Sequence, residues 1–112
     1  MKHKIVLVRF PFDDFISSKV RPAVCLTDPI GQYRHVVLAF ISSKNQSEVE
    51  KTDLLIRTED PDFDRTGLKT TSILRLHRLI TVSSNIILRE LGVLSKTQQE
   101  PVNQKIRVLF KL

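Results

Sequence analysis

Short apolar segments, separated by turn-forming residues, run through most of the sequence and limit the folds open to it. In residues 4–10, alternate positions would point to opposite faces of a strand, and apolar side chains stand on both faces. A strand that is apolar on both faces is covered on both sides, as in a small barrel. The pattern predicts a mainly β fold with helical decoration, and further strands are expected at residues 22–27, 35–41, 53–57 and, as one strand or two, 71–82.

The first helix signal lies between residues 83 and 92. Ser83 or Ser84 can act as the N-cap of a short helix, because a serine hydroxyl accepts a hydrogen bond from the first helical turn. The helix would run through Leu91, and Gly92 would end it.

A second helix is expected at the C-terminus. Ser95 and Gln98 have the spacing of a capping box. Pro101 would clash with the carbonyl group four residues before it, so the helix is expected to kink there or to start there. One apolar stripe would face the core and contain Val102, Ile106 and Leu109.

The length of 112 residues suits a single domain, which we expect to span residues 1–112. No segment has the roughly 18 consecutive apolar residues of a membrane helix. The basic start of the chain is followed too soon by Arg9 and Pro11 to be a signal peptide. We therefore expect a cytoplasmic protein without membrane association.

Cys25 is the single cysteine and lies among apolar residues, which predicts a buried, inert thiol and argues against a disulfide or a zinc site.

The charge of the chain is basic and uneven. The formal net charge is +6, and from Arg65 to the end there are nine Lys and Arg residues against Glu90 and Glu100. A positive surface attracts nucleic acid or an acidic protein. The acidic residues between 59 and 64 lack the spacing of a calcium loop, so this segment is expected to be a solvated loop.

A few polar residues interrupt the apolar pattern at strand ends. Arg21 precedes Pro22, which favours extended geometry for the arginine at the mouth of a strand. A cation held there can receive an anion, or it can simply solvate the strand end. The loop at residues 12–19 has a length that suits a lid over a groove. Ser42 and Ser43 begin a polar segment that continues to residue 47, and they can cap backbone groups or hold a phosphate or a base edge.

Arg75 and His77 stand two positions apart on a predicted strand, so their side chains share one face, and Arg78 follows them. Two arginines, hydroxyl groups and a histidine can carry out the attack of an RNA 2′-hydroxyl on its own phosphate. That reaction needs a base for the hydroxyl, cations for the pentacovalent phosphate and an acid for the leaving oxygen. The set comes without metal-ligand spacing, and we expect no cofactor.

The sequence also resembles a known family, the MazF/PemK toxins of type II toxin–antitoxin systems. The similar segments follow one another along nearly the whole chain. They are residues 5–12 (IVLVRFPF), 18–24 (SKVRPAV), 39–43 (AFISS), 66–68 (TGL), 72–75 (SILR) and 91–95 (LGVLS).

The resemblance implies an SH3-like barrel with a C-terminal helix and a homodimer. It also implies metal-independent, sequence-selective cleavage of single-stranded RNA, with 2′,3′-cyclic phosphate and 5′-hydroxyl products. A cognate antitoxin that fills the RNA groove is expected as a partner.

The resemblance further assigns residues to the reaction. Arg21 matches the catalytic arginine before proline, Ser42 matches a catalytic threonine or serine, and Arg75 matches a second arginine of the PemK branch. His77 stands where PemK-type relatives have an aspartate that assists catalysis, and its neutral imidazole could accept the 2′-hydroxyl proton instead. It could equally be a surface histidine. The residues expected to bind RNA beside this set are Lys19, Ser43 and Arg78.

Two other functions fit the same fold. One is a barrel that acts by binding a protein, as the related CcdB toxins bind DNA gyrase. The other is a basic barrel that binds RNA without cutting it. Because the chain has only six phenylalanines, one tyrosine and no tryptophan, a surface built purely for base stacking is disfavoured.

Overall fold

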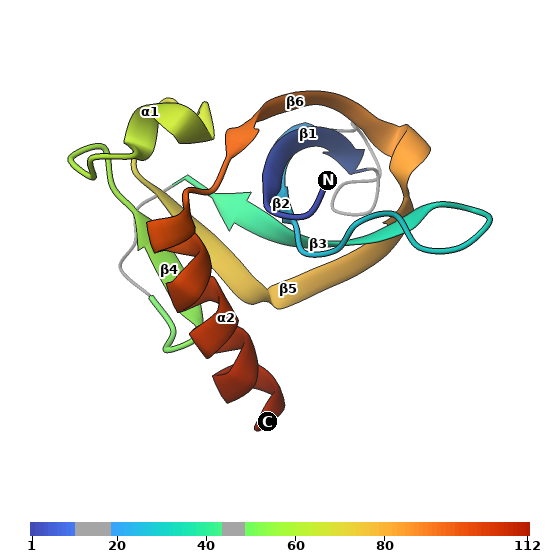
Figure 1. The fold of residues 1–112 in the computed structure, drawn as a ribbon. Coiled ribbons are helices and arrows are strands. Elements are labelled where there is room, and N and C mark those ends of the chain that lie inside the picture. Colours follow the sequence, from blue (N-terminus) through green and yellow to red (C-terminus); the bar gives the residue numbers. More distant parts are fainter. Residues whose placement is uncertain (11–18, 44–48) are drawn as a thin grey trace.

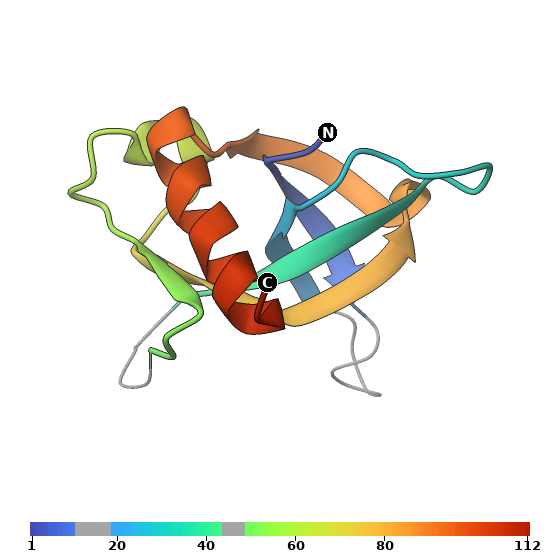
Figure 2. The ribbon, with the colours of Figure 1, turned by 60° about the horizontal axis from the view of Figure 1, so that its bottom comes forward.

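The computed structural model describes residues 1–10, 19–43 and 49–112, and the strands in these residues form one antiparallel sheet (Figures 1 and 2). The order of strands across the sheet is β4-β5-β3-β2-β1-β6. The loop expected over residues 12–19 and the polar positions 44–47 fall almost entirely outside the described residues. The strands are β1 (Lys4–Phe10), β2 (Lys19–Cys25), β3 (His35–Ser42), β4 (Asp53–Ile56), β5 (Ser72–Ser83) and β6 (Ile87–Val93).

The sheet curls strongly, so that β6 passes over β1 and meets the end of β5 through a short 3-10 helix, η1 (Ser84–Ile86) (Figure 1). The helix α2 (Lys96–Phe110) lies beside β4 and β5, and α1 (Phe63–Thr66) lies near β6. The prediction of a mainly β, barrel-like fold with a C-terminal helix is confirmed.

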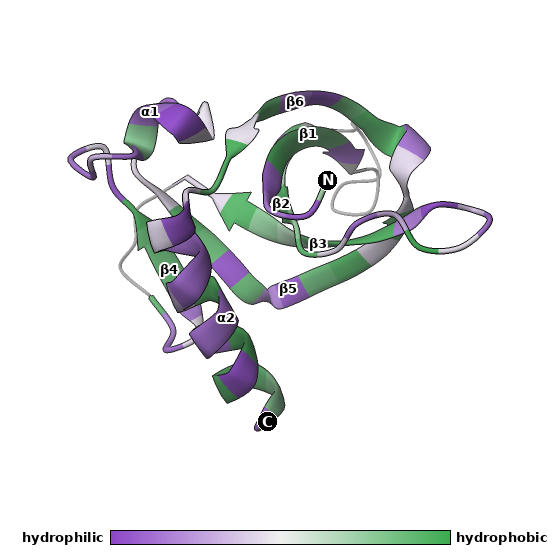
Figure 3. Cartoon of the chain, in the orientation of Figure 1, coloured by the Kyte–Doolittle hydropathy of each residue, from purple (hydrophilic) through white to green (hydrophobic). Residues whose placement is uncertain are grey.

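Both faces of the central strands are buried, as the apolar pattern predicts. Ile5 of β1 and Val24 of β2 belong to an apolar cluster that includes Phe63 of α1 and Val102 of α2. Their neighbours along the strands point the other way and form a second cluster with residues of β5, η1 and β6. The strands are accordingly hydrophobic along much of their length, whereas the turns are more hydrophilic (Figure 3). The sheet thus separates two cores.

The prediction of a helix from residue 83 or 84 through Leu91 is wrong. Ser83 does act as an N-cap, but the helix is the single turn of η1, and residues 87–93 form β6. The backbone of β1 needs hydrogen-bond partners on both sides, and β6 supplies the second set, with Lys4 opposite Val93 and Leu7 opposite Arg89. This long-range pairing overrides the local helix signal.

Gly92 has a different role from the helix stop that was expected. It lies in β6, where a Cβ atom would collide with the backbone of Arg65 and Thr66 at the end of α1. Only glycine lets these two segments approach so closely. Gly92 therefore allows α1 to dock against the sheet.

The acidic segment at residues 59–64 is only partly the solvated loop that was expected. It turns at residues 58–62 and then enters α1, whose Phe63 is buried. Asp60 accepts a hydrogen bond from the backbone N–H of Arg57, at 3.0 Å. The carboxylate of Asp60 therefore stabilises the turn that follows β4.

The C-terminal helix has the capping box that was predicted. Ser95 Oγ accepts from the backbone N–H of Gln98 at 3.3 Å, and the Gln98 side chain accepts from the backbone N–H of Ser95 at 2.8 Å. These bonds start the helix at Lys96, so Pro101 is an internal residue, and the alternative that the helix starts at Pro101 is wrong. Val102 is buried and Ile106 packs against the same core.

Cys25 is fully buried in β2, and burial raises the pKa of its thiol to about 11, as expected for an inert cysteine. Among the described residues, no helix is both long and apolar enough to cross a membrane.

Candidate active site

Strand register brings the polar residues of three strands to one face of the sheet. In β5, Arg75 lies directly opposite Phe40 of β3 on one side and Asp53 of β4 on the other. Residues that lie opposite each other in neighbouring strands point to the same face. Ser42 stands two positions beyond Phe40 in β3, so its side chain joins this face.

Arg21 reaches the same face from β2. It is half-buried and lies opposite Val8 of β1. The β2–β3 register pairs Ala23 with Phe40, and Arg21 stands two positions from Ala23 in β2, so it shares the face of Phe40. Arg21 and Arg75 therefore stand on strands that flank β3, in the order β5-β3-β2.

Side-chain hydrogen bonds orient the Arg75 guanidinium from two strands. Its Nε donates to Ser42 Oγ at 3.2 Å, and its Nη1 donates to Asp53 Oδ2 at 2.6 Å. The Asp53 side chain is fully buried, whereas 20% of the Arg75 side chain is exposed. Because the guanidinium is planar, two bonds to different strands fix the direction in which its remaining edge faces.

Asp53 is the residue that sequence reasoning missed. Its Oδ2 also accepts from the backbone N–H of Glu50 at 2.7 Å, and its own N–H donates to the Glu50 carbonyl at 3.0 Å. The only signal in the sequence is a carboxylate that opens an otherwise apolar strand. Its partner Arg75 lies 22 residues further along the chain, so the pairing depends on register.

His77 joins the same group. Its Nδ1 lies 3.7 Å from Asp53 Oδ1, and 42% of its side chain is exposed. The expectation that Arg75 and His77 share a face agrees with this geometry, since both approach one carboxylate. The strand is irregular here, because the register between β3 and β5 shifts between Ala39 and Phe40. Hydrophilic bands interrupt the hydrophobic course of β5 (Figure 3).

The three residues expected to bind RNA differ in how close the structure places them to this group. Arg78 lies over the Phe40 ring, with 5.4 Å between its guanidinium carbon and the ring centroid, and so remains next to the group. Ser43 is exposed directly after β3. Lys19 is the first residue of β2, and its side chain is outside the described part of the chain.

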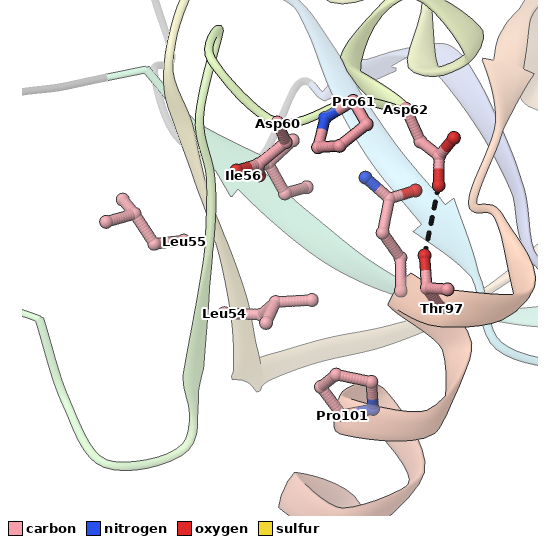
Figure 4. A pocket seen from close by; sticks show the side chains of 9 residues that line it. Leu54, Leu55, Ile56, Asp60, Pro61, Asp62, Thr97 and Pro101 are labelled. Carbon is pink, nitrogen blue, oxygen red and sulfur yellow. Dashed lines mark hydrogen bonds between the residues drawn. The ribbon is translucent and has the colours of Figure 1, made fainter.

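A cavity of about 410 Å³ lies elsewhere, between β4, α2 and the turn before α1 (Figure 4). Thr97 Oγ1 donates to Asp62 Oδ2 across it, at 3.0 Å. Hydrogen bonds from Ser95 and Thr97 lower the pKa of Asp62. The lining of the cavity is otherwise largely apolar, with Leu54, Ile56 and Pro101 pointing inward, and it contains neither an arginine nor a histidine.

The described residues also contain no cluster of side chains suited to a metal ion. The group around Arg75 is therefore the candidate active site.

Comparison with known proteins links this arrangement to one family. The model of the PemK-like, MazF-like toxins of type II toxin–antitoxin systems matches residues 2–110. Among curated proteins, no sequence matches the chain.

Solved structures share the fold at low sequence identity. The Mycobacterium tuberculosis toxin MazF-mt6 superposes with a TM-score of 0.73 and 19% identity, over 97% of each chain. An endoribonuclease in complex with its cognate antitoxin, from a mycobacterial species, has a TM-score of 0.73 and 11% identity, over 100% of this chain and 95% of its own. Another mycobacterial endoribonuclease has a TM-score of 0.67 and 12% identity, over 100% of this chain and 92% of its own.

Proposed function

Because this chain belongs to the family of PemK-like, MazF-like toxins of type II toxin–antitoxin systems, we propose that it is an endoribonuclease that cleaves single-stranded RNA, including messenger RNA. The cleavage is sequence-specific and needs no metal ion. The 2′-hydroxyl attacks the adjacent phosphate, which yields a 2′,3′-cyclic phosphate and a 5′-hydroxyl end.

One observation carries this proposal: a guanidinium bonds to both a hydroxyl and a buried carboxylate, and an imidazole lies beside the same carboxylate. Arg75 contacts Ser42 and Asp53, and His77 lies beside Asp53. These are the groups that transesterification at phosphorus requires, namely a cation for the phosphate oxygens, a hydrogen-bond donor and a base. A surface used only to bind a protein has no need of this combination.

Each residue of the group has a separate task. Arg21 and Arg75 stabilise the charge of the pentacovalent phosphate, and Arg21 also donates a proton to the leaving 5′-oxygen. Ser42 Oγ accepts from Arg75 Nε, which leaves its own hydroxyl hydrogen to donate to a phosphate oxygen. His77 accepts the proton of the 2′-hydroxyl.

RNA is held beside the reacting phosphate by Lys19, Ser43 and Arg78. Arg78 stays close to the group because it stacks on Phe40. Ser43 is exposed next to Ser42. Contacts of this kind position the strand and weaken as salt is added.

The decisive experiment incubates the purified protein with single-stranded RNA in excess EDTA. We expect discrete fragments whose ends, analysed by mass spectrometry, carry a 2′,3′-cyclic phosphate and a 5′-hydroxyl. Intact RNA would contradict the proposal. RNA that is bound but uncut would instead favour a basic RNA-binding barrel, and a covalent seryl-phosphate would contradict the role of Ser42.

The protein acts in the cytoplasm as a homodimer, with residues 1–112 of each copy forming one domain. A cognate antitoxin inhibits it by placing an acidic, disordered segment along the positive path that includes Arg21 and Arg75. Antitoxin binding therefore weakens as the ionic strength rises. A monomer in light scattering at micromolar concentration would rule out the dimer.

A further inference from the structure

The buried carboxylate of Asp53 has two oxygens in very different surroundings. Oδ2 accepts from Arg75 Nη1 at 2.6 Å and from the Glu50 backbone N–H at 2.7 Å. Oδ1 is buried and has no hydrogen-bond partner among the described residues. A buried carboxylate oxygen without a hydrogen-bond donor costs folding free energy. A hydrogen bond from a nearby donor to Oδ1 would remove that cost.

His77 is the nearest candidate for that donor. Its Nδ1 lies 3.7 Å from Oδ1, just beyond hydrogen-bond range, and the imidazole is partly exposed. Among the described residues, the Asp53 carboxylate of β4 lies within ion-pair distance of the ring, and Arg75 of the same strand as His77 shares that carboxylate. Arg78 follows His77 in the sequence of β5. Arg78 is held over the Phe40 ring. Asp53 is therefore the acceptor nearest to Nδ1 within this group.

We propose that Asp53 is a positioning residue that accepts a hydrogen bond from His77 Nδ1–H and so keeps His77 in the tautomer whose Nε2 can act as the base. A neutral imidazole carries one proton, so the nitrogen that donates to Asp53 leaves the other nitrogen as an acceptor. The same carboxylate holds Arg75 through its second oxygen. One buried side chain thereby orients both the base and the cation.

This inference rests on the proposed function for its consequence in catalysis. The 2′-hydroxyl proton passes to His77 Nε2 while the bond between the 2′-oxygen and phosphorus forms. The bond between phosphorus and the 5′-oxygen breaks, and the 5′-oxygen takes a proton from the acid, for which Arg21 is the candidate. Asp53 takes no part in the proton transfer itself.

The first test observes the tautomer directly and needs no RNA. Long-range ¹H–¹⁵N correlation spectra of the ¹⁵N-labelled full chain, recorded where His77 is neutral, distinguish a protonated Nδ1 from a protonated Nε2. The chain has three histidines, so His3 and His35 are internal references, and the His77→Gln variant assigns the signal. We expect His77 to be protonated at Nδ1. Protonation at Nε2 in the unmodified protein would overturn the inference.

The second test removes the acceptor charge. Asp53→Asn is expected to shift His77 toward the Nε2-protonated form and to lower kcat about 10²-fold, the contribution of a positioned base. Asp60→Asn is the matched control, because Asp60 lies in the turn after β4 and bonds to the Arg57 backbone instead. An unchanged tautomer in Asp53→Asn would also overturn the inference.

The single variant Asp53→Asn leaves Arg75 without its buried partner and could fail to fold. In that case the tautomer of His77 is measured in the double variant Asp53→Asn/Arg75→Gln, which removes both charges of the buried pair together. The experiments distinguish failure of the proposed function from failure of the positioning role of Asp53. Absence of RNA cleavage by the unmodified protein rejects the proposed function but leaves the tautomer measurement unaffected. Cleavage with His77 protonated at Nε2 rejects only the role of Asp53.

Discussion

At the scale of single residues, the buried ion pair determines which substitutions can be interpreted. Asp53 is fully buried, so removing the Arg75 charge would leave a carboxylate without its cation inside the protein. Breaking such a pair typically costs about 3–5 kcal/mol of unfolding free energy. A loss of activity in Arg75→Ala would therefore mix instability with chemistry, whereas Arg75→Lys keeps the charge and removes the planar fork.

Arg21→Lys and Arg75→Lys are each expected to lower kcat by about 10²- to 10³-fold, because lysine cannot donate to two phosphate oxygens as guanidinium does. Cleavage rates on a defined single-stranded RNA measure the effect. Arg65→Lys, an exposed position on α1, is the matched control and should keep full activity. Undiminished cleavage by Arg21→Ala would remove Arg21 from the mechanism.

His77→Ala is expected to lower the cleavage rate by about 10²-fold, since it removes the proposed base. Because 42% of the His77 side chain is exposed, added imidazole should reach the vacated position and restore part of the rate. His35→Ala is the control, because His35 is an exposed histidine and the first residue of β3. An unaltered rate in His77→Ala would place the base elsewhere, with Arg21 as the next candidate.

At the scale of elements, the sheet register creates the site. β5 is paired with β3 along its length and with β4 only through its first residues, so the region around Arg75 is the place where three strands meet. The end of β3 brings Ser42 there, and the start of β4 brings Asp53. A shift of one residue in either pairing would turn these side chains to the opposite face.

The junction of β6 and α1 offers a test of the fold at this scale. Gly92→Ala is expected to destabilise the protein by about 1–3 kcal/mol, because the new methyl group would collide with backbone atoms of Arg65 and Thr66. Urea denaturation measures the change in unfolding free energy. Gly31→Ala is a useful comparison, because no atom lies within 4 Å of a Cβ there and its cost comes only from the left-handed backbone, with φ of +76°. Equal stability of Gly92→Ala and the unmodified protein would refute the close approach.

At the scale of the whole molecule, one curled sheet with a core on each face holds the residues of the candidate active site. The second cluster, which includes Val8, Ala23 and Leu38, lies on the face that carries Arg21 and Arg75. On this face, the apolar side chains of β2 and β3 give way to Arg21 and Ser42 along the same strands. The close-packed core beneath them limits how far the side chains of the candidate active site can move.

Cys25 belongs to that second core and reports on its integrity. Burial raises the pKa of the thiol from the ordinary 9.0 to about 11, so the folded protein keeps the thiol protonated at pH 8 and excludes reagents from it. Ellman's reagent is expected to react only as fast as the protein unfolds. Because the unfolded chain releases this proton near pH 9, the associated stabilisation is complete below pH 9 and is lost as the pH rises toward 11. Rapid reaction of the native protein at pH 8 would show that the core is open.

Local patterns were sufficient for much of this protein. Alternation of apolar residues predicted the strands, because the period of two is a property of the strand itself. The capping box of α2 was predicted by Ser95 and Gln98, which act within one helical turn. The apolar neighbours of Cys25 likewise predicted its burial.

Only the tertiary structure decided the features that depend on pairing between distant segments. A helix was predicted from residue 83 or 84 through Leu91, yet residues 87–93 form β6, because β1 lacks a partner on one side without them. Asp53 could not be assigned from its neighbours, because its role follows from lying opposite Arg75 across the β4–β5 register. Backbone hydrogen bonds between strands are specified by the whole sheet, and no local sequence window contains that information.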